Sequence, residues 1–276
     1  MPVLVTGATG TVGRALVEQL HAGGHEVRAL TRNPAKADLP EGVEVVAGDL
    51  AEPAGLAAAF ENVTAAHLIC FAGDDYAPLA HAEEIVRLAE QAGVRKVTVL
   101  RGDIEKGPLE RAVEAGGLEW TYLSPVEFMS NALEWAPSIR EEGVVREAFP
   151  ESRSAMVHEA DIAGVAAVAL TSDGHAGKEY FLTGPQALTV PDKVRIIGEV
   201  LGREIKYIEL SQDERVALWR ESGYDDETID WFLMISTNPP AVGYTVQPTV
   251  EEVTGRPPRT FAQWVREHAA TFTAGS

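Results

Sequence analysis

The stretch Val3-Leu-Val-Thr-Gly-Ala-Thr-Gly-Thr-Val-Gly13 decides the fold, because three features follow one another in it without a gap. Residues 3–5 are apolar and predict a buried strand. Three glycines come next, and apolar residues then recur at helical spacing, at Val12, Ala15, Leu16 and Leu20. The sequence therefore predicts a strand, a glycine turn and a helix, in that order.

The spacing of the glycines points to a phosphate-binding turn. A dinucleotide pyrophosphate reaches the free N–H groups of a helix start only where no Cβ stands in the way. We expect Gly7 to make the tight turn, Gly10 to let the phosphates approach, and Gly13 to let the helix pack on the strand. Hydroxyls of Thr6, Thr9 and Thr11 would lie beside the phosphate path. The cofactor residues expected here are Gly7, Thr9, Gly10, Thr11, Val12 and Gly13.

This turn has an alternative interpretation. Its spacing, Gly-x-x-Gly-x-x-Gly, differs from the common Gly-x-Gly-x-x-Gly, so an ordinary glycine-rich turn is the competing hypothesis. Its position at the opening of a strand-helix-strand unit favours the dinucleotide.

Strands and helices alternate through the first half of the chain. Apolar runs predict strands at 3–5, 26–30, 43–47, 67–71, 96–100 and 120–123. Helical patterns lie between them, notably at 82–89, closed by Gly93, and at 109–115, closed by Gly116 and Gly117. This alternation predicts an α/β fold with a doubly wound parallel sheet covered by helices on both faces.

The pattern changes near Pro125. Helices are expected at 161–170, at 194–201 after a capping box from Thr189 to Asp192, from Asp213, from Asp226 and at 261–270, with strands at 180–182 and 205–209. We therefore divide the chain into a dinucleotide-binding Rossmann domain, 1–127, and a smaller α-rich C-terminal substrate lobe, 128–276. Residues 155–185 are expected to return to the sheet.

Composition excludes several classes of function. The formal net charge of −19 disfavours a nucleic-acid partner. A single cysteine, Cys70, rules out a disulfide framework and a cysteine-based metal site, and the seven histidines show no ligand spacing. The chain has no run of about 18 apolar residues and no signal peptide before residue 3, so we expect a cytoplasmic protein with no membrane or metal.

Basic residues follow the second predicted strand. About 20 residues beyond the glycines, an acidic side chain would bind the ribose of NAD and an arginine would accommodate the 2′-phosphate of NADP. The chain has Thr31 and Arg32 there, with Lys36 one turn further on, which favours NADP over NAD. A solvent-facing arginine that binds nothing is the alternative.

Two further pairs are expected at the cofactor. Asp49 and Leu50 follow the third strand, where a carboxylate could accept from the adenine amino group. An aspartate at a helix start is an equal alternative for Asp49. Phe71 and Ala72 end the fourth strand, at the crevice where ligands of open α/β sheets bind. Small residues there would let the nicotinamide ribose come close.

Taken together, these segments resemble the NmrA-like family of atypical short-chain dehydrogenases over nearly the whole chain. The resemblance rests on Thr6-Gly-Ala-Thr-Gly-Thr-Val-Gly13, Thr31-Arg-Asn-Pro34, Gly48-Asp-Leu50, Gly117-Leu-Glu-Trp-Thr-Tyr-Leu-Ser-Pro125, Phe128-Met-Ser-Asn131, His158-Glu-Ala-Asp161, Tyr180-Phe-Leu-Thr-Gly-Pro185 and Val253-Thr-Gly-Arg-Pro-Pro-Arg-Thr-Phe-Ala-Gln-Trp264. That family includes NADPH-dependent quinone and azo-dye reductases, tailoring reductases, and regulators that bind dinucleotide without turnover.

One feature of standard short-chain dehydrogenases is missing. Their acid is a tyrosine with a lysine four residues later, and none of the six tyrosines here is followed by one. Arg101 stands where many relatives carry a serine or threonine. It could stabilise an oxyanion, or simply pair with Asp103 or Glu105. His158 could donate a proton if it faces the cleft, although a structural histidine is the favoured alternative.

The expected substrate residues are aromatic or apolar. Phe128 and Met129 could form a wall against nicotinamide and substrate, or equally belong to a core. Tyr76, Trp135 and Tyr244 could be wall or lid residues, although packing is the usual role of single aromatics in loops.

The resemblance and the residues together predict an NADPH-dependent oxidoreductase. Hydride would pass to a planar aromatic, quinone-like or polyketide-like molecule bound between the sheet edge and the C-terminal lobe. One alternative is a non-catalytic NADP sensor that binds a partner, and another is a tailoring enzyme that uses bound nicotinamide for dehydration or isomerisation. The expected partner is a small aromatic substrate. The sequence leaves open whether the protein forms a homodimer.

Overall fold

The computed structural model describes residues 2–73, 77–103 and 105–273 and divides them into two compact units. Unit 1 comprises Met1–Pro125, Glu159–Leu182 and Thr249–Arg256, and unit 2 comprises Val126–His158, Thr183–Pro248 and Pro257–Ser276. The chain therefore leaves unit 1 and returns to it twice.

Unit 1 is built on a parallel sheet of seven strands in the order β11-β8-β7-β4-β1-β2-β3. The strands are β1 (Val3–Val5), β2 (Val27–Thr31), β3 (Glu44–Ala47), β4 (Ala65–Ile69), β7 (Lys96–Leu100), β8 (Glu119–Pro125) and β11 (Lys178–Leu182). All six strands expected in the first half are present. The seventh, β11, pairs with β8 in register, with Tyr180 opposite Leu123. The doubly wound α/β prediction is confirmed.

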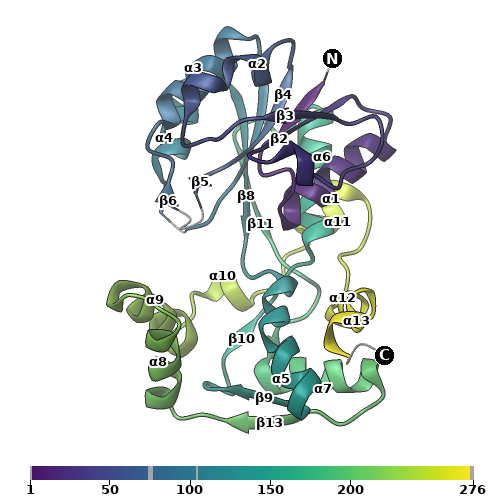
Figure 1. Ribbon diagram of the computed structural model, residues 1–276, viewed down its shortest axis with the longest axis vertical. Coiled ribbons are helices and arrows are strands. Elements are labelled where there is room, and N and C mark those ends of the chain that lie inside the picture. Colours follow the sequence, from purple (N-terminus) through teal and green to yellow (C-terminus); the bar gives the residue numbers. More distant parts are fainter. Residues whose placement is uncertain (1, 74–76, 104, 274–276) are drawn as a thin grey trace. The chain divides into compact units, whose positions relative to one another are not determined.

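Helices cover both faces of this sheet (Figure 1). On one face lie α2 (Ala57–Phe60), α3 (Ala82–Gln91) and α4 (Pro108–Ala115), and on the other α1 (Thr11–Ala22), α6 (Glu159–Thr171) and α11 (Thr249–Thr254). The core under α3 and α4 is a continuous apolar cluster that includes Leu4, Phe60, Leu68, Ile85 and Val99. Strand side chains alternate between the two faces, which explains why both are apolar.

The remaining segments of unit 1 are short. They are the 3₁₀ turns η1 (Pro34–Lys36) and η2 (Pro53–Gly55) and the two-residue strands β5 (Phe71–Ala72) and β6 (Ala77–Pro78), which pair antiparallel. The expected fourth strand, 67–71, is wrong at its end, because β4 stops at Ile69 and Phe71 belongs to β5.

Unit 2 combines helices with two small sheets. Its elements are η3 (Met129–Trp135), α5 (Ala136–Glu142), β9 (Val144–Glu147), β10 (Arg153–Ser154), β12 (Leu188–Thr189), α7 (Val190–Leu201), β13 (Lys206–Glu209), α8 (Gln212–Glu221), α9 (Asp226–Thr237), α10 (Ala241–Tyr244), α12 (Phe261–Glu267) and α13 (Ala269–Phe272). The capping box from Thr189 to Asp192 is confirmed. The terminal helix expected at 261–270 is interrupted at His268, which ends α12.

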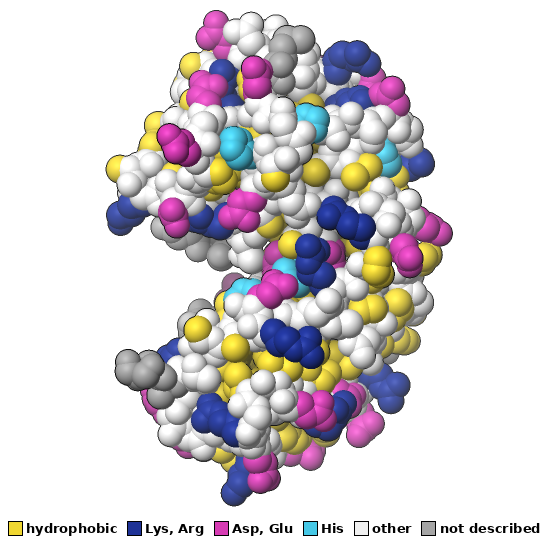
Figure 2. All heavy atoms as spheres, turned by 90° about the vertical axis from the view of Figure 1, so that its right-hand side faces the viewer, with side chains coloured by type: hydrophobic (Ala, Val, Ile, Leu, Met, Phe, Trp, Pro, Cys, Tyr) yellow, Lys and Arg dark blue, Asp and Glu magenta, His cyan; other side chains and the backbone are white. Residues whose placement is uncertain are grey.

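No helix in the described part of the chain is both long enough and apolar enough to cross a membrane. Nor does any group of three or more His, Cys, Asp or Glu side chains among those residues suit a metal ion. Acidic side chains are dispersed over the face drawn in Figure 2 and do not gather in one patch.

A buried histidine lies in the middle of the sheet. His67 of β4 is fully buried, and its Nδ1 lies 2.8 Å from the Thr98 hydroxyl on β7. Its Nε2 has no hydrogen-bond partner among the described residues. Burial lowers the pKa of His67 to about 4, because the charged imidazolium would lose its hydration. His67 is therefore neutral in the folded protein near neutral pH.

This histidine makes stability depend on pH. Its pKa is 6.5 when unfolded and about 4 when folded, so the unfolded state takes up the proton first as pH falls. Stability should decline by about 3 kcal/mol as pH falls from about 6.5 to about 4. Denaturant titrations across this range should show the decline reduced in His67→Gln. They should show it unchanged in His25→Gln, where the histidine is exposed. Equal slopes in the two variants would contradict this assignment.

Candidate active site

The glycine turn has the close approach that its spacing predicts. Gly7 adopts φ +60°, a conformation that side chains disfavour, and its carbonyl accepts the Gly10 N–H at 2.9 Å. A Cβ on Gly13 would lie 2.1 Å from the Gly7 carbonyl oxygen, inside any permitted contact. A Cβ on Gly10 would lie 3.2 Å from the same oxygen. The first turn of α1 can pack here only because Gly13 has no side chain.

The start of α1 presents backbone N–H groups to solvent. Gly10 is its N-cap, with extended backbone and no side-chain cap, and the first turn holds no acidic residue. Thr9, Gly10 and Thr11 are exposed. Uncapped N–H groups and the positive end of the helix dipole together make an anion site. Thr6 does not contribute to it as expected, because its buried hydroxyl donates to the His67 carbonyl at 2.9 Å.

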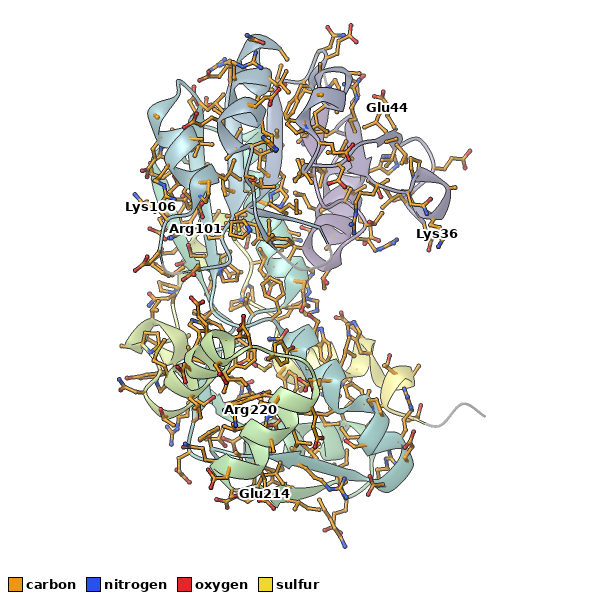
Figure 3. All side chains as sticks on the ribbon, turned by 60° about the vertical axis from the view of Figure 1, so that its left-hand side comes forward. Lys36, Glu44, Arg101, Lys106, Glu214 and Arg220 are labelled. Atoms are coloured by element: carbon orange, nitrogen blue, oxygen red, sulfur yellow. The ribbon has the colours of Figure 1, made fainter. Side chains whose placement is uncertain are left out.

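Basic side chains lie beyond the second strand, as the sequence predicts. Arg32 and Lys36 are exposed, and Lys36 projects outward from η1 (Figure 3). The Thr31 hydroxyl accepts the Asn33 N–H at 3.3 Å. Arg14, which the sequence interpretation missed, donates from the first turn of α1 to the Asp38 carbonyl. The position of Arg14 directly after Gly13 was the sequence signal that could have identified it.

Asp49 and Leu50 have structural partners. The Asp49 carboxylate accepts the Ala51 N–H at 2.9 Å, as in a local turn before η2. This is close to the helix-start alternative, and an adenine contact stays a prediction. Leu50 is 6% exposed and belongs to the core of unit 1, so only its backbone is free to meet a ligand.

Small residues follow β4 at the carboxyl edge of the sheet. Phe71 and Ala72 are half-buried there. Burial raises the pKa of the neighbouring Cys70 thiol to about 11, so Cys70 is protonated at neutral pH and is a poor nucleophile. Tyr76 lies outside the described residues.

Arg101 is held in a buried ion-pair cluster. Its side chain is 5% exposed, its Nε lies 3.4 Å from Glu110, and its Nη1 pairs with Glu179 of β11. The Ser124 hydroxyl donates to the same Glu179 carboxylate at 2.9 Å. The guanidinium also lies over the ring of Tyr122. In Figure 3, Arg101 lies inside unit 1, whereas Lys106 is at its outer edge.

This cluster bears on the proposed role of Arg101. Two carboxylates more than balance its single charge, which supports the ion-pair alternative, with partners from α4 and β11. Sequence reasoning missed Glu110 and Glu179, because the second lies 78 residues from Arg101 along the chain. A catalytic role for Arg101 stays a prediction.

Unit 2 holds the other expected site residues. His158 is 5% exposed, and its Nε2 lies 3.0 Å from the Glu267 carboxylate, which fits the structural alternative. Met129 is 1% exposed and belongs to the apolar core of unit 2, which fits the core alternative, and a place in a substrate wall stays a prediction. Phe128 is half-buried. The indole of Trp135 donates to Glu147 at 3.1 Å.

Fold and turn together define a dinucleotide-binding α/β protein, and comparison with known proteins agrees. A family model described as NAD(P)H-binding matches residues 7–102. The chain is 37% identical to a (4-alkanoyl-5-oxo-2,5-dihydrofuran-3-yl)methyl phosphate reductase of Streptomyces griseus, over 98% of this chain and 99% of the relative. It is 32% identical to an NAD(P)H azoreductase of Xenophilus azovorans, over 99% of each chain.

Solved structures give the same result. An NADPH-dependent quinone oxidoreductase of Escherichia coli, complexed with NADPH, is similar with a TM-score of 0.79 and 26% identity, over 97% of this chain and 99% of that one. The chain belongs to the NAD(P)H-binding, NmrA-like family of atypical short-chain dehydrogenases and is an NAD(P)H-dependent oxidoreductase.

Substitutions at Gly13 and Gly10 should affect different properties, stability in the first case and NADPH binding in the second. Gly13→Ala should destabilise the protein by about 3 kcal/mol, because its Cβ would overlap the Gly7 carbonyl. Gly10→Ala should fold, since its contact of 3.2 Å needs only a small shift, but should bind NADPH about tenfold more weakly. Thermal melts and NADPH fluorescence titrations measure both effects. Gly55→Ala is the control, because nothing lies within 4 Å of its Cβ. A Gly13→Ala protein as stable as this control would contradict the packing argument.

Proposed function

We propose that this enzyme passes hydride from NADPH to a planar, conjugated acceptor of the quinone, azo or unsaturated carbonyl type. The observation that carries the proposal is the lack of the tyrosine-lysine acid of standard short-chain dehydrogenases in the sequence. No tyrosine has a lysine four residues later. Tyr122, the tyrosine of β8, is buried, and its hydroxyl donates to the Glu110 carbonyl at 2.9 Å. Burial raises its pKa well above the usual range.

The chemistry of a conjugated acceptor suits such a site. Hydride addition to an isolated ketone creates a strongly basic alkoxide, which needs a proton donor in the transition state. Addition to a quinone, or to a conjugated lactone that also carries an acyl group, spreads the charge over several atoms and produces a weakly basic oxygen. Positioning and exclusion of water then supply most of the catalysis.

The relatives support this acceptor class. Their names specify an azo compound, a quinone and a dihydrofuran ring that carries an oxo and an alkanoyl group. Each can delocalise the incoming charge. The acceptor of this chain would belong to the same electronic class, whatever its ring system.

NADPH is the proposed reductant because of the charges around the second strand. Arg32 and Lys36 supply positive charge where a 2′-phosphate would lie, and the next carboxylate along the chain is Asp38. The pyrophosphate would lie on the first turn of α1, against Thr9, Gly10, Thr11, Val12 and Gly13. The rest of the dinucleotide would contact Thr31, Asp49, Phe71 and Ala72.

A non-catalytic NADP sensor is the second candidate. The same lack of an acid favours it, as does the engagement of both Arg101 and His158 in ion pairs or hydrogen bonds. The two candidates differ in whether bound NADPH is ever oxidised.

Single-turnover oxidation of bound NADPH tests the proposed function. The protein is loaded with one equivalent of NADPH and mixed with a quinone, an azo dye or a conjugated lactone, and loss of nicotinamide absorbance is followed. We expect oxidation with at least one conjugated acceptor and none with a saturated ketone of similar size. Tight NADPH binding without oxidation across all of them would favour the sensor.

Arg32→Asp tests the cofactor preference. Removal of the guanidinium and addition of a carboxylate should weaken NADPH binding about a hundredfold, because a charge-assisted contact becomes a repulsion. NADH binding should stay within about threefold of wild type. Arg87→Asp, the same charge change on the exposed face of α3, is the control. Equal losses for the two cofactors would argue against a 2′-phosphate contact.

A further inference from the structure

Unit 2 contains a recess of about 440 Å³ that no part of the cofactor site uses. Residues of two segments line it, 149–153 from the end of β9 to the start of β10, and 236–244 from the end of α9 through α10. Its volume falls within the range of small-molecule sites. Its walls are rich in rings, supplied by Phe149, Pro150, Pro239 and Tyr244. Such walls suit a flat ligand.

The backbone is strained at the wall of this recess. Phe149 has φ +56°, in the left-handed region that large side chains rarely occupy. A bond of 3.0 Å from the Ser152 N–H to the Phe149 carbonyl closes the turn. Strain of this kind persists only where the surrounding structure imposes it, and it is common at ligand sites. Phe149 is therefore a wall residue held in place at a conformational cost.

Three hydrogen-bond donors line the same recess. They belong to lining residues of the recess, as the guanidinium of Arg153 and the hydroxyls of Ser152 and Ser236. Among the described residues, none of these three groups has a hydrogen bond or ion pair. The next residue, Ser154, is fixed by Lys193 and Glu127, so the strand that carries Arg153 is anchored. These donors suit an oxygen acceptor on the ligand.

Two features oppose a full negative charge in the recess. Glu151 lines it alongside Arg153. Ser236 and Thr237 are the last residues of α9, where the carbonyl end of the helix carries partial negative charge. The donors therefore favour a ligand with an oxygen that accepts hydrogen bonds, while the surrounding potential disfavours a negatively charged ligand.

We propose that this recess binds a flat, neutral carbonyl compound, with Arg153 and the two serines donating to its oxygen and Phe149 and Tyr244 against its ring. The proposal goes beyond the proposed function, because it gives unit 2 a ligand site of its own, with a preference for neutral over anionic compounds. Substitutions in the recess should leave dinucleotide binding unaffected.

Equilibrium dialysis of the full chain saturated with NADP⁺ tests the proposal, because the oxidised cofactor prevents turnover. The neutral probe is 2,3-dimethyl-1,4-naphthoquinone, whose ring carbons are blocked against attack by a thiol. The anionic probe is 2-hydroxy-3-methyl-1,4-naphthoquinone, which is of similar size and ionised at neutral pH. We expect the neutral quinone to bind at least about fivefold more tightly.

Four variants locate the site. Arg153→Gln should weaken binding of the neutral quinone about tenfold, whereas Arg266→Gln should not. Arg266 is a matched control, an exposed arginine of α12 in the same unit with no ion pair among the described residues. Phe149→Gly should weaken binding about fivefold without lowering the melting temperature, because glycine accepts the positive φ. Glu151→Gln should bring the two affinities within about twofold.

The outcomes separate this proposal from the proposed function. Unchanged affinity in both Arg153→Gln and Phe149→Gly, or equal losses in Arg153→Gln and Arg266→Gln, would overturn the recess as the site even if NADPH is oxidised by quinones. Tighter binding of the anionic quinone would overturn the preference for a neutral carbonyl. Quinone binding that depends on Arg153 and Phe149, without any oxidation of NADPH by quinones, would support the recess and contradict the proposed acceptor class.

Discussion

The rest of unit 1 depends on the contact between Gly13 and the carbonyl of Gly7. A side chain at Gly13 would overlap that oxygen at 2.1 Å, so α1 can approach β1 only with glycine there. This approach aims the uncapped start of α1 at the carboxyl edge of the sheet. It also places α1 against α6, where the Gln19 side chain donates to the Ala160 carbonyl at 2.7 Å. The absence of a Cβ at Gly13 therefore determines both how α1 packs on the sheet and how its N-terminus is placed for a phosphate.

A second constraint is the use of buried charge. In a chain of net charge −19, the well-buried cations are engaged: Arg101 by Glu110 and Glu179, and Lys193 by Glu127 and Ser154. A buried ion pair contributes little net stability, but removal of one partner leaves an uncompensated charge. These pairs fix β7 to β11 and β10 to α7. Their charges are used for structure, which is consistent with a reaction that asks little acid catalysis of the protein.

The sequence predicted the elements better than the side-chain contacts. The strands of unit 1 follow from short apolar runs, and the glycine turn follows from spacing within eleven residues, so local information was enough. Glu179 and Glu267, which contact Arg101 and His158, lie 78 and 109 residues away from them, and no local pattern indicates them. Thr6 was misplaced for the same reason. Whether a hydroxyl or a thioether faces a ligand or a core depends on how distant segments pack.

The path of the chain explains how one dinucleotide site can serve different acceptors. The chain leaves unit 1 at Pro125 and at Leu182, the carboxyl ends of the paired strands β8 and β11. Both insertions of unit 2 thus begin at the edge of the sheet that also carries the glycine turn. Insertions there can change without disturbing the strand register or the contact of Gly13 with Gly7. Changes in unit 2 can therefore alter acceptor specificity and leave in place the cofactor that unit 1 binds, on which the hydride chemistry depends.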